Sequence, residues 1–303
     1  MLVGQEDVVE GVLVGIFARG HVLIEGAPGL GKTLLVRTLG QVLGCAFRRI
    51  QFTPDLMPSD VTGGNVFDQR ANGFTFHQGP LFAQLVLADE INRAPAKTQS
   101  ALLEAMQEAS VTVDGTTRPL PQPFFVLATQ NPIESQGTYP LPEAQLDRFL
   151  LKLEMRAPSR EAERQMLANH VAGFDAARLD AAGLRAIVSA EEVVAMQAAL
   201  ATVHVDAAVL DYITDLATRS RNHRAIAFGA SPRASVALLG TARAVAAAAG
   251  REFVVPDDVK QMAPAVLRHR ILLQPDAELE GVMPDECIAE ILREAAVPHT
   301  VAA

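Results

Sequence analysis

The chain has 303 residues, of which 49% are hydrophobic and 20% are charged, as in an ordinary globular protein with a sizeable core. Its formal net charge of −9 argues against wholesale coating of nucleic acid. The two cysteines are far apart, no apolar run approaches the ~18 residues that a membrane span needs, and no signal-peptide pattern begins the chain. We therefore expect a cytoplasmic protein of one or two domains, without disulfides or a membrane span.

The first diagnostic stretch is a glycine-rich run that follows the apolar segment 21–25. This segment predicts a buried strand, and apolar residues from Leu34 onward recur at helical spacing. Strand, glycine-rich loop and helix form the context of a phosphate-binding loop, in which Lys32 reaches the β- and γ-phosphates and the Thr33 hydroxyl binds Mg²⁺. The sequence thus predicts a nucleoside triphosphate site. The run reads Gly26-Ala27-Pro28-Gly29-Leu30-Gly31-Lys32-Thr33.

Later segments alternate between strand-like and helical patterns, which predicts a parallel α/β sheet. Two turns, centred on Asn72-Gly73 and Asp114-Gly115, predict projecting hairpins. A helix is expected over 96–109. The remaining strands of the sheet are expected at 46–51, 84–88, 124–128 and 150–155.

The composition changes after residues 156–159, and the rest of the chain is rich in alanine and helical in period. We place a domain boundary near residue 157. Residues 1–157 are expected to form an α/β nucleotide-binding domain and residues 158–303 an all-helical domain. Its helices are expected over 159–170, 190–202, 207–220, 233–249, 257–266 and 285–296.

Two carboxylates end the apolar strand that precedes Asp89. Asp89 suits the coordination sphere of Mg²⁺, and Glu90 suits polarisation of the water that attacks the γ-phosphate. A kinase must avoid activating water, so the second acid favours hydrolysis. The alternative is a solvated Asp-Glu pair at a strand end.

Three further positions carry weaker signals. Asn131 follows the fourth strand, where it could hydrogen-bond the γ-phosphate or the attacking water; alternatively it caps a turn before Pro132. Residues 141–149 predict a short helix ending in an arginine. Ser231 and Pro232 predict the N-cap and first position of a helix that also carries Arg233.

With these motifs together, essentially the whole chain resembles a MoxR-type AAA+ ATPase. The resemblance implies a P-loop NTPase with a five-stranded parallel sheet, a helical lid, and assembly into a ring, usually hexameric, with ATP between protomers. It rests on the phosphate-binding loop and on Gly79-Pro80-Leu81-Phe82, Asp89-Glu90-Ile91-Asn92-Arg93-Ala94, Glu104-Ala105-Met106-Gln107-Glu108, Ala128-Thr129-Gln130-Asn131-Pro132 and Leu146-Asp147-Arg148-Phe149.

The resemblance also implies roles for single residues. The ATP-binding set comprises Gly26, Ala27, Pro28, Gly29, Leu30, Gly31, Lys32, Thr33 and Leu34, with Val3, Gly4 and Gln5 beside the adenine. The catalytic and metal-binding set comprises Thr33 and Asp89 for Mg²⁺, Glu90 of the Walker B pair, Asn131 as sensor 1, Arg148 as an arginine finger acting on a neighbour's ATP, and Arg233 as sensor 2.

The family is described as chaperone-like, often acting with a von Willebrand factor A domain partner to mature metalloenzymes or to remodel complexes. The two hairpins match insertions of a clade that includes magnesium chelatase motors. The segment before Val3 is shorter than in most relatives, so the chain is expected to begin close to a domain boundary.

Two other functions remain open at this point. The first is a switch that binds ATP to assemble a partner and hardly turns over, which would need neither Glu90 nor Arg148. The second is a DNA-acting helicase or loader, which the negative charge disfavours. A basic cluster of Arg219, Arg221 and Arg224 is interpreted as surface or interprotomer charge, with a nucleic-acid site as the alternative.

Overall fold

The computed structural model describes residues 3–70, 72–131, 138–176, 178 and 183–298. The chain divides into two compact units, and the division falls within three elements: helix α1 (Glu6–Phe17), strand β9 (Leu151–Met155) and helix α7 (Ala190–Ala199). The boundary expected near residue 157 stays a prediction. The first unit holds residues 1–12, 21–141 and 153–194, and the second holds 13–20, 142–152 and 195–303.

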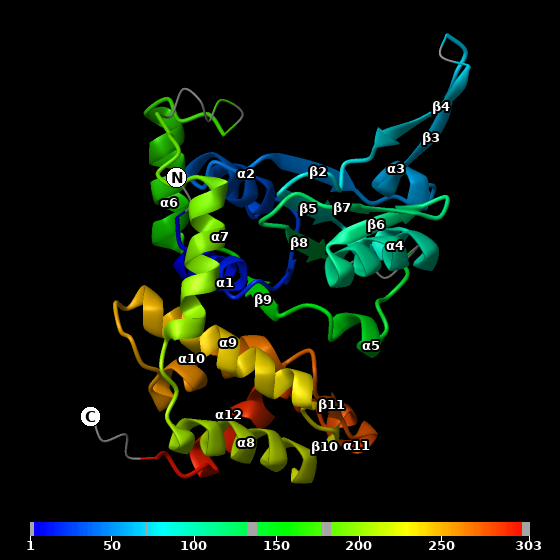
Figure 1. Ribbon diagram of the computed structural model, residues 1–303. Coiled ribbons are helices and arrows are strands. Elements are labelled where there is room, and N and C mark those ends of the chain that lie inside the picture. Colours follow the sequence, from blue (N-terminus) through cyan, green and yellow to red (C-terminus); the bar gives the residue numbers. More distant parts are fainter. Residues whose placement is uncertain (1–2, 71, 132–137, 177, 179–182, 299–303) are drawn as a thin grey trace. The chain divides into compact units, whose positions relative to one another are not determined.

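The central sheet is parallel and, within the described residues, has five strands in the order β2-β5-β8-β1-β9 (Figure 1). Strands β1, β5 and β8 are buried along nearly their whole length, as expected for a parallel sheet covered on both faces. The predicted parallel α/β sheet is confirmed. Besides β9, the strands are β1 (Val22–Gly26), β2 (Phe47–Gln51), β5 (Leu85–Asp89) and β8 (Phe125–Gln130).

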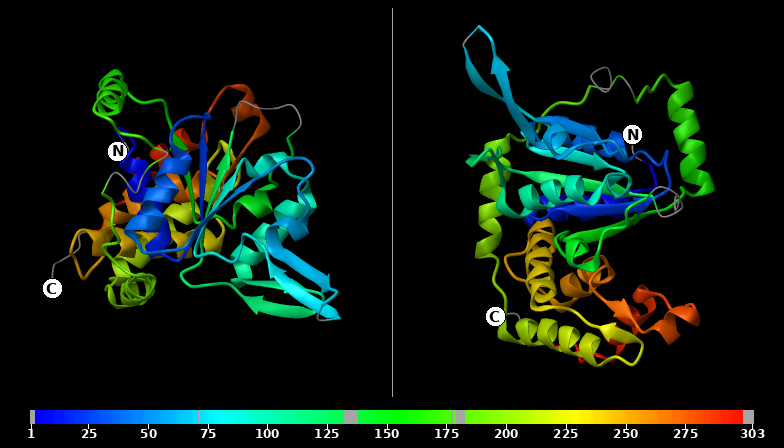
Figure 2. Two further views of the ribbon diagram at one scale, coloured as in Figure 1. Left: turned by 90° about the horizontal axis from the view of Figure 1, so that it is seen from above. Right: turned by 90° about the vertical axis from the view of Figure 1, so that its right-hand side faces the viewer.

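Helices cover both faces of this sheet. Helix α2 (Lys32–Val42) leads from β1 toward β2, whereas α4 (Ala96–Glu108) leads from β5 to β8, in the opposite direction across the sheet. Right-handed crossovers that run in opposite directions place their helices on opposite faces. Figure 2 shows α2 and α4 on the two sides of the strands. The unit also contains α3 (Pro58–Thr62), a 3₁₀ turn η1 (Ile91–Arg93) and α6 (Arg160–Val171).

Both predicted hairpins are present and contact each other, but the turn of the longer one lies before Gly73, which pairs with Asp68, and is not centred on Asn72-Gly73. Strands β3 (Gly63–Asp68) and β4 (Gly73–Gln78) form the longer one, which projects away from the sheet in Figures 1 and 2. The shorter joins β6 (Ser110–Val113) to β7 (Thr116–Pro119).

The Asp114-Gly115 sequence of the shorter hairpin suits the backbone of its turn. Asp114 and Gly115 have φ angles of 50° and 74°, which a two-residue type I′ turn requires. The Asn65 side-chain amide donates to Asp114 Oδ2 at 2.6 Å, and the Arg118 guanidinium lies 3.8 Å from the centre of the Phe76 ring. The two hairpins are therefore joined by a hydrogen bond and a cation–π contact.

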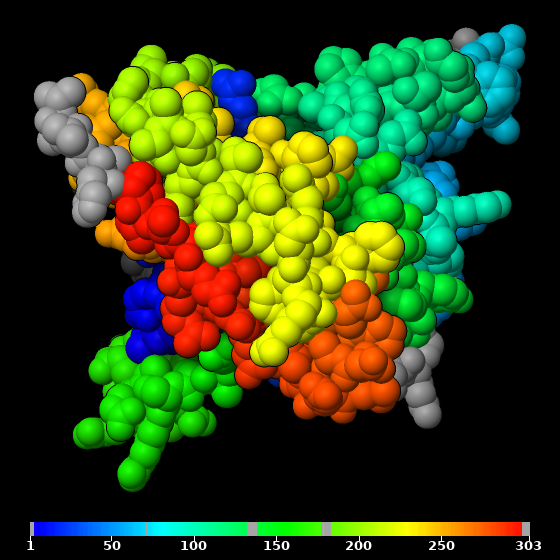
Figure 3. Space-filling model, turned by 90° about the horizontal axis from the view of Figure 1, so that it is seen from below, coloured from blue at the N-terminus to red at the C-terminus, as the bar shows by residue number. Residues whose placement is uncertain are grey.

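The second unit is mainly helical, but the expectation that residues 158–303 are all-helical is wrong in one place. A short antiparallel pair, β10 (Ile226–Phe228) and β11 (Leu272–Leu273), has no counterpart among the predicted elements. Helix α8 packs on α9 and α12, and Figure 3 shows α8 in yellow-green beside α12 in red. The helices are α5 (Glu143–Leu146), η3 (Leu200–Thr202), α8 (Ala207–Asn222), α9 (Pro232–Ala248), α10 (Pro256–Leu267), α11 (Pro275–Leu279) and α12 (Pro284–Glu294).

Alanine lets the helices of this unit approach closely. Helix α9 buries Ala234, Ala237, Ala242 and Ala244 along its length, and it packs on α10. The apolar face of α10 contributes further buried residues to the same core. Among the helices that the structure describes, none is both long and apolar enough to cross a membrane.

A buried histidine ties the sheet of the first unit to α4. His21 Nε2 donates to the carbonyl of Met106 over 2.9 Å, and Nδ1 accepts the backbone N–H of Val126 over 3.0 Å. Because Nδ1 is used as an acceptor, this arrangement requires the neutral ring. Burial lowers the pKa of His21 from 6.5 to about 4, although the bond to Met106 opposes the shift.

This pKa shift predicts a loss of stability in mild acid. The unfolded chain takes up the proton near pH 6.5, whereas the folded chain does so only near pH 4. The contribution of neutral His21 is therefore complete above pH 6.5 and is lost as the pH falls toward 4, by about 3 kcal/mol. Urea unfolding across this range should show a shallower pH dependence in His21→Gln than in the parent protein. The exposed His77→Gln is the matched control, and an unchanged slope in His21→Gln would contradict the assignment.

Candidate active site

The loop between β1 and α2 has the backbone shape of an anion cradle. Gly29 and Gly31 have φ angles of 85° and 91°, in the left-handed region that glycine adopts without strain. Gly31 is also the N-cap of α2, so the loop leads directly into the N-terminus of a helix. The first N–H groups of a helix lack intrahelical acceptors and carry partial positive charge. The predicted phosphate-binding loop is thus followed by the helix that it requires.

Lys32 is buried at the start of α2, and its side chain turns back toward the loop. Its Nζ donates to the carbonyl of Gly26 over 2.8 Å. Burial lowers the pKa of Lys32, whereas the charges of Asp89 and Glu90 raise it. A buried ammonium needs negative partners, and a phosphate group would add to the two carboxylates already near it.

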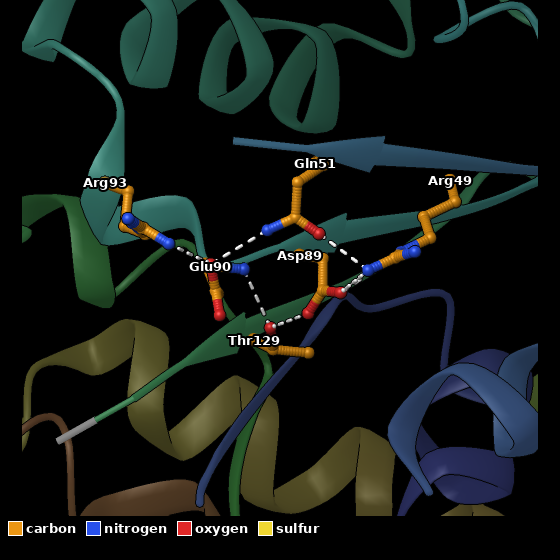
Figure 4. Close-up of polar contacts among 6 residues, drawn as sticks. All are labelled: Arg49, Gln51, Asp89, Glu90, Arg93 and Thr129. Atoms are coloured by element: carbon orange, nitrogen blue, oxygen red, sulfur yellow. Dashed lines mark hydrogen bonds and ion pairs between the residues drawn. The ribbon is translucent and has the colours of Figure 1, made fainter. Parts of the chain in front are cut away.

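The two acidic residues at the end of β5 both bond to one buried hydroxyl, Asp89 through its carboxylate and Glu90 through its backbone N–H. The backbone N–H of Glu90 donates to Thr129 Oγ1 over 2.9 Å, and that hydroxyl donates to Asp89 Oδ1 over 2.6 Å (Figure 4). Thr129 comes from the neighbouring strand β8 and is fully buried. One side chain therefore fixes the positions of both acids relative to β8.

Glu90 has an unusual backbone for a residue with a side chain. Its φ and ψ angles are 57° and 51°, in the left-handed region, where it forms the N-cap of η1. Such a conformation costs on the order of 1–3 kcal/mol and persists only where surrounding contacts enforce it. The bond from the Glu90 N–H to Thr129 is one of those contacts.

Strand β2 supplies two residues that our sequence analysis did not identify as functional. The Arg49 guanidinium pairs with Asp89 Oδ2 at 2.6 Å and also donates to Gln51 Oε1 at 2.6 Å. The Gln51 amide donates to Glu90 Oε2 over 2.8 Å (Figure 4). Arg93 donates to the same Glu90 oxygen over 3.0 Å, so this carboxylate is held from two sides.

The phosphate-binding loop, the two acids, Arg49 and Gln51 line a pocket of about 500 Å³ in the first unit. The pocket is lined by cationic side chains of Lys32, Arg37 and Arg49 and by the carboxylates of Asp89 and Glu90. This excess of positive charge suits a polyanionic ligand such as a triphosphate. Of the predicted site residues, the structure brings these together around the pocket: Pro28, Gly29, Gly31, Lys32, Thr33, Leu34, Asp89, Glu90 and Asn131.

Other predicted residues lie elsewhere. Val3, Gly4 and Gln5 are not among the described residues that line the pocket, and Gln5 instead donates to the carbonyl of Arg156 over 2.9 Å. Pro132 lies outside the described residues. The proximity of residues 3–5 to an adenine stays a prediction.

The two predicted arginines belong to the second unit. Helix α5 ends at Leu146, so Arg148 lies beyond the helix and does not end it as expected. Arg233 is at the start of α9, with Nη1 3.3 Å from Asp147 Oδ2. Ser231 occupies the predicted N-cap position of α9, but its hydroxyl makes no capping hydrogen bond. The catalytic roles of both arginines stay predictions.

Two members of the predicted arginine cluster, Arg219 and Arg221, lie on α8 and have partners within the second unit, whereas Arg224 follows the helix. Arg219 pairs with Asp215 at 2.6 Å, and Arg221 donates to the carbonyl of Ala230 over 2.8 Å.

Among the described residues, no group of three or more His, Cys, Asp or Glu side chains is arranged to hold a metal ion.

Comparison with known proteins gives similarities over nearly the whole chain. A sequence profile of the "ATPase family associated with various cellular activities (AAA)" matches residues 21–151, and one of the AAA lid domain matches residues 218–291. The chain is 44% identical to Chaperone MoxR1 of Mycobacterium tuberculosis, over 99% of this chain and 80% of that protein. It is 45% identical to the uncharacterized protein YeaC of Bacillus subtilis, over 98% and 92% of the two chains.

A solved structure agrees with these similarities. The crystal structure of a "putative ATPase" from Cytophaga hutchinsonii is 41% identical in sequence and superposes with a TM-score of 0.90. The match covers 98% of this chain and 92% of that one.

The shared hydroxyl of Thr129 gives a testable prediction. Thr129→Val keeps the side-chain shape but leaves the Glu90 N–H and Asp89 Oδ1 without this partner, which should cost about 1–3 kcal/mol of stability. Turnover of ATP by the folded variant should fall further than ATP affinity, because the acids lose their fixed positions.

Thr98→Val is the matched control for this experiment. It removes another buried hydroxyl of the first unit, which donates to the Leu56 carbonyl over 2.6 Å. Equal loss of turnover per folded molecule in the two variants would show that Thr129 has no special link to the acids.

Proposed function

Because the chain belongs to the MoxR family of AAA+ ATPases, we propose that it hydrolyses ATP in the pocket at Lys32 and uses the cycle to remodel partner proteins. One observation carries this proposal: a buried lysine and two carboxylates meet in a pocket beside a phosphate-binding loop. In a parallel α/β sheet, ligands bind at the carboxyl ends of the strands, where this pocket lies.

The charges in the pocket suit the proposed chemistry. Lys32 compensates the charge of the β- and γ-phosphates, and the loop N–H groups bind their oxygens. Glu90 accepts the proton of the water whose oxygen attacks the γ-phosphorus, and ADP leaves as the bridging bond breaks. Asn131, which lines the same pocket, orients that water or the γ-phosphate. A switch with little turnover would not need a carboxylate at this position.

The donor set also fits Mg²⁺. The Thr33 hydroxyl and the Asp89 carboxylate both line the pocket, and oxygen donors are the ligands that this ion prefers. The ion would neutralise phosphate charge when bound. Arg49 and Thr129 hold the Asp89 carboxylate by its two oxygens and so orient it for this role.

We further propose that copies of the chain form a ring, as a hexamer in the cytoplasm, in which Arg148 reaches the ATP of a neighbour and Arg233 acts as the lid's sensor. A von Willebrand factor A domain protein is the proposed partner, and maturation of a metalloenzyme is one proposed task. Family membership supports these assignments.

The roles of Lys32 and Glu90 can be separated by measuring binding and turnover independently. Lys32→Ala should weaken binding of a fluorescent ATP analogue by about 10- to 100-fold, because charged hydrogen bonds are lost. Glu90→Gln should keep binding nearly intact while turnover falls by about 10²- to 10⁴-fold, because an amide cannot accept the proton.

Glu163→Gln provides the control for these two variants. It makes the same chemical change at an exposed position on α6 and should alter neither quantity. If Glu90→Gln lost analogue binding as completely as Lys32→Ala, Glu90 would have a binding role and the proposed mechanism would be wrong.

Mixing two inactive variants tests whether Arg148 acts between subunits. Arg148→Ala should bind ATP nearly normally but lose about 10³- to 10⁵-fold in rate, as for other arginine fingers. Mixed with Lys32→Ala it should recover part of the activity, since an intact Lys32 site then meets an intact neighbouring Arg148. Mixed oligomers that stay inactive at every ratio would contradict action across the interface.

A further inference from the structure

The turn that carries Arg148 is held by two residues that follow helix α10. The Arg270 guanidinium donates to the carbonyls of Phe149 over 2.6 Å and Leu150 over 2.9 Å. His269 Nε2 lies 2.9 Å from the same Phe149 carbonyl. All these residues belong to the second unit, so the turn over 147–150 is anchored within it.

Asp147 is the counterion that this anchor requires. Its Oδ1 accepts a hydrogen bond from Arg270 Nε over 2.8 Å, and the Arg270 side chain is only 3% exposed. Burial lowers the pKa of Arg270, and the bond to Asp147 opposes this. A buried cation without its partner is costly, so the pair fixes Asp147 firmly in place.

The second oxygen of Asp147 faces a different arginine. Oδ2 lies 3.3 Å from Arg233 Nη1, and the Arg233 side chain is 56% exposed. One carboxylate therefore binds two arginines, Arg270, which is buried, and Arg233, which is exposed. An exposed ion pair contributes little free energy, so a competing phosphate group would draw Arg233 away while Arg270 stays bound.

We infer that Asp147 is a positioning residue for two arginines at once: it holds Arg233 when no nucleotide is bound and fixes the backbone turn of the adjacent Arg148. This inference rests on the proposed function, which assigns Arg148 and Arg233 to ATP. ATP then competes with Asp147 for Arg233. The same aspartate also positions Arg148, the arginine that is proposed to complete the neighbour's site.

The inference predicts opposite effects on binding and turnover in Asp147→Asn. Loss of the carboxylate charge releases Arg233, so the dissociation constant for an ATP analogue should fall by about two- to five-fold. Arg270 loses its counterion and keeps only neutral oxygen acceptors in the turn, so the turn that carries Arg148 is held less firmly and kcat should fall by about ten- to a hundred-fold. A purely structural role for Asp147 would not tighten binding.

Two further variants isolate the causes. Compared with Arg233→Ala alone, the double variant Arg233→Ala/Asp147→Asn should show no gain in affinity, because there is no Arg233 to release. The loss of kcat caused by Asp147→Asn should remain. Asp285→Asn is the matched control: it breaks the nearby pair with Arg268, at 2.7 Å, in the same unit. It should lower the melting temperature without tightening binding.

The outcomes separate this inference from the proposed function. If Asp147→Asn behaves as Asp285→Asn does, or if the gain in affinity persists without Arg233, the inference is wrong although the ATPase assignment stands. If Arg148→Ala alone keeps full turnover, the proposed function of that arginine fails instead. Should Asp147→Asn not fold, Asp147→Glu decides: its extra methylene moves the carboxylate relative to both arginines while keeping a charge for Arg270, so kcat should fall, and unchanged kcat together with unchanged affinity would overturn the inference.

Discussion

The register of three neighbouring strands determines the chemistry of the pocket. Gln51 pairs with Asp89 across β2 and β5, and Ala88 pairs with Ala128 across β5 and β8. The polar residues at the ends of these strands are therefore level with one another, and Thr129 reaches both acids. A shift of one residue would turn every one of these side chains to the other face. Because β5 and β8 are apolar on both faces, the contacts of Thr129 and Gln51 with the acids, rather than an alternating apolar pattern, distinguish this register from a shifted one.

Both units depend on a buried cation whose charge is compensated locally, but they solve the problem differently. Lys32 keeps a backbone carbonyl as its direct partner, with two carboxylates farther away. Arg270 has a carboxylate and several carbonyls as direct partners. The first arrangement leaves capacity for an anion to arrive, whereas the second is saturated and is suited to anchoring. This difference is why we place ligand binding at Lys32 and positioning at Arg270.

The sequence allowed the phosphate-binding loop, the acids and the strands of the sheet to be predicted because each depends on neighbours along the chain. A long apolar run or a glycine pattern is local information. Arg49, Gln51 and Thr129 were missed as functional residues because their partners lie 39 or 40 residues away and are specified only by strand register. The same is true of Asp147, which meets Arg270 across 123 residues of sequence. Strands β10 and β11 are too short to leave a periodic pattern.

The left-handed backbone of Glu90 has a consequence for how this protein could evolve. Glycine or asparagine would adopt the φ angle of 57° more easily, so selection for thermal robustness alone would favour replacing this glutamate. Such a replacement would remove the carboxylate from the pocket. If Glu90 has the role proposed above, position 90 is a place where backbone strain and turnover pull in opposite directions.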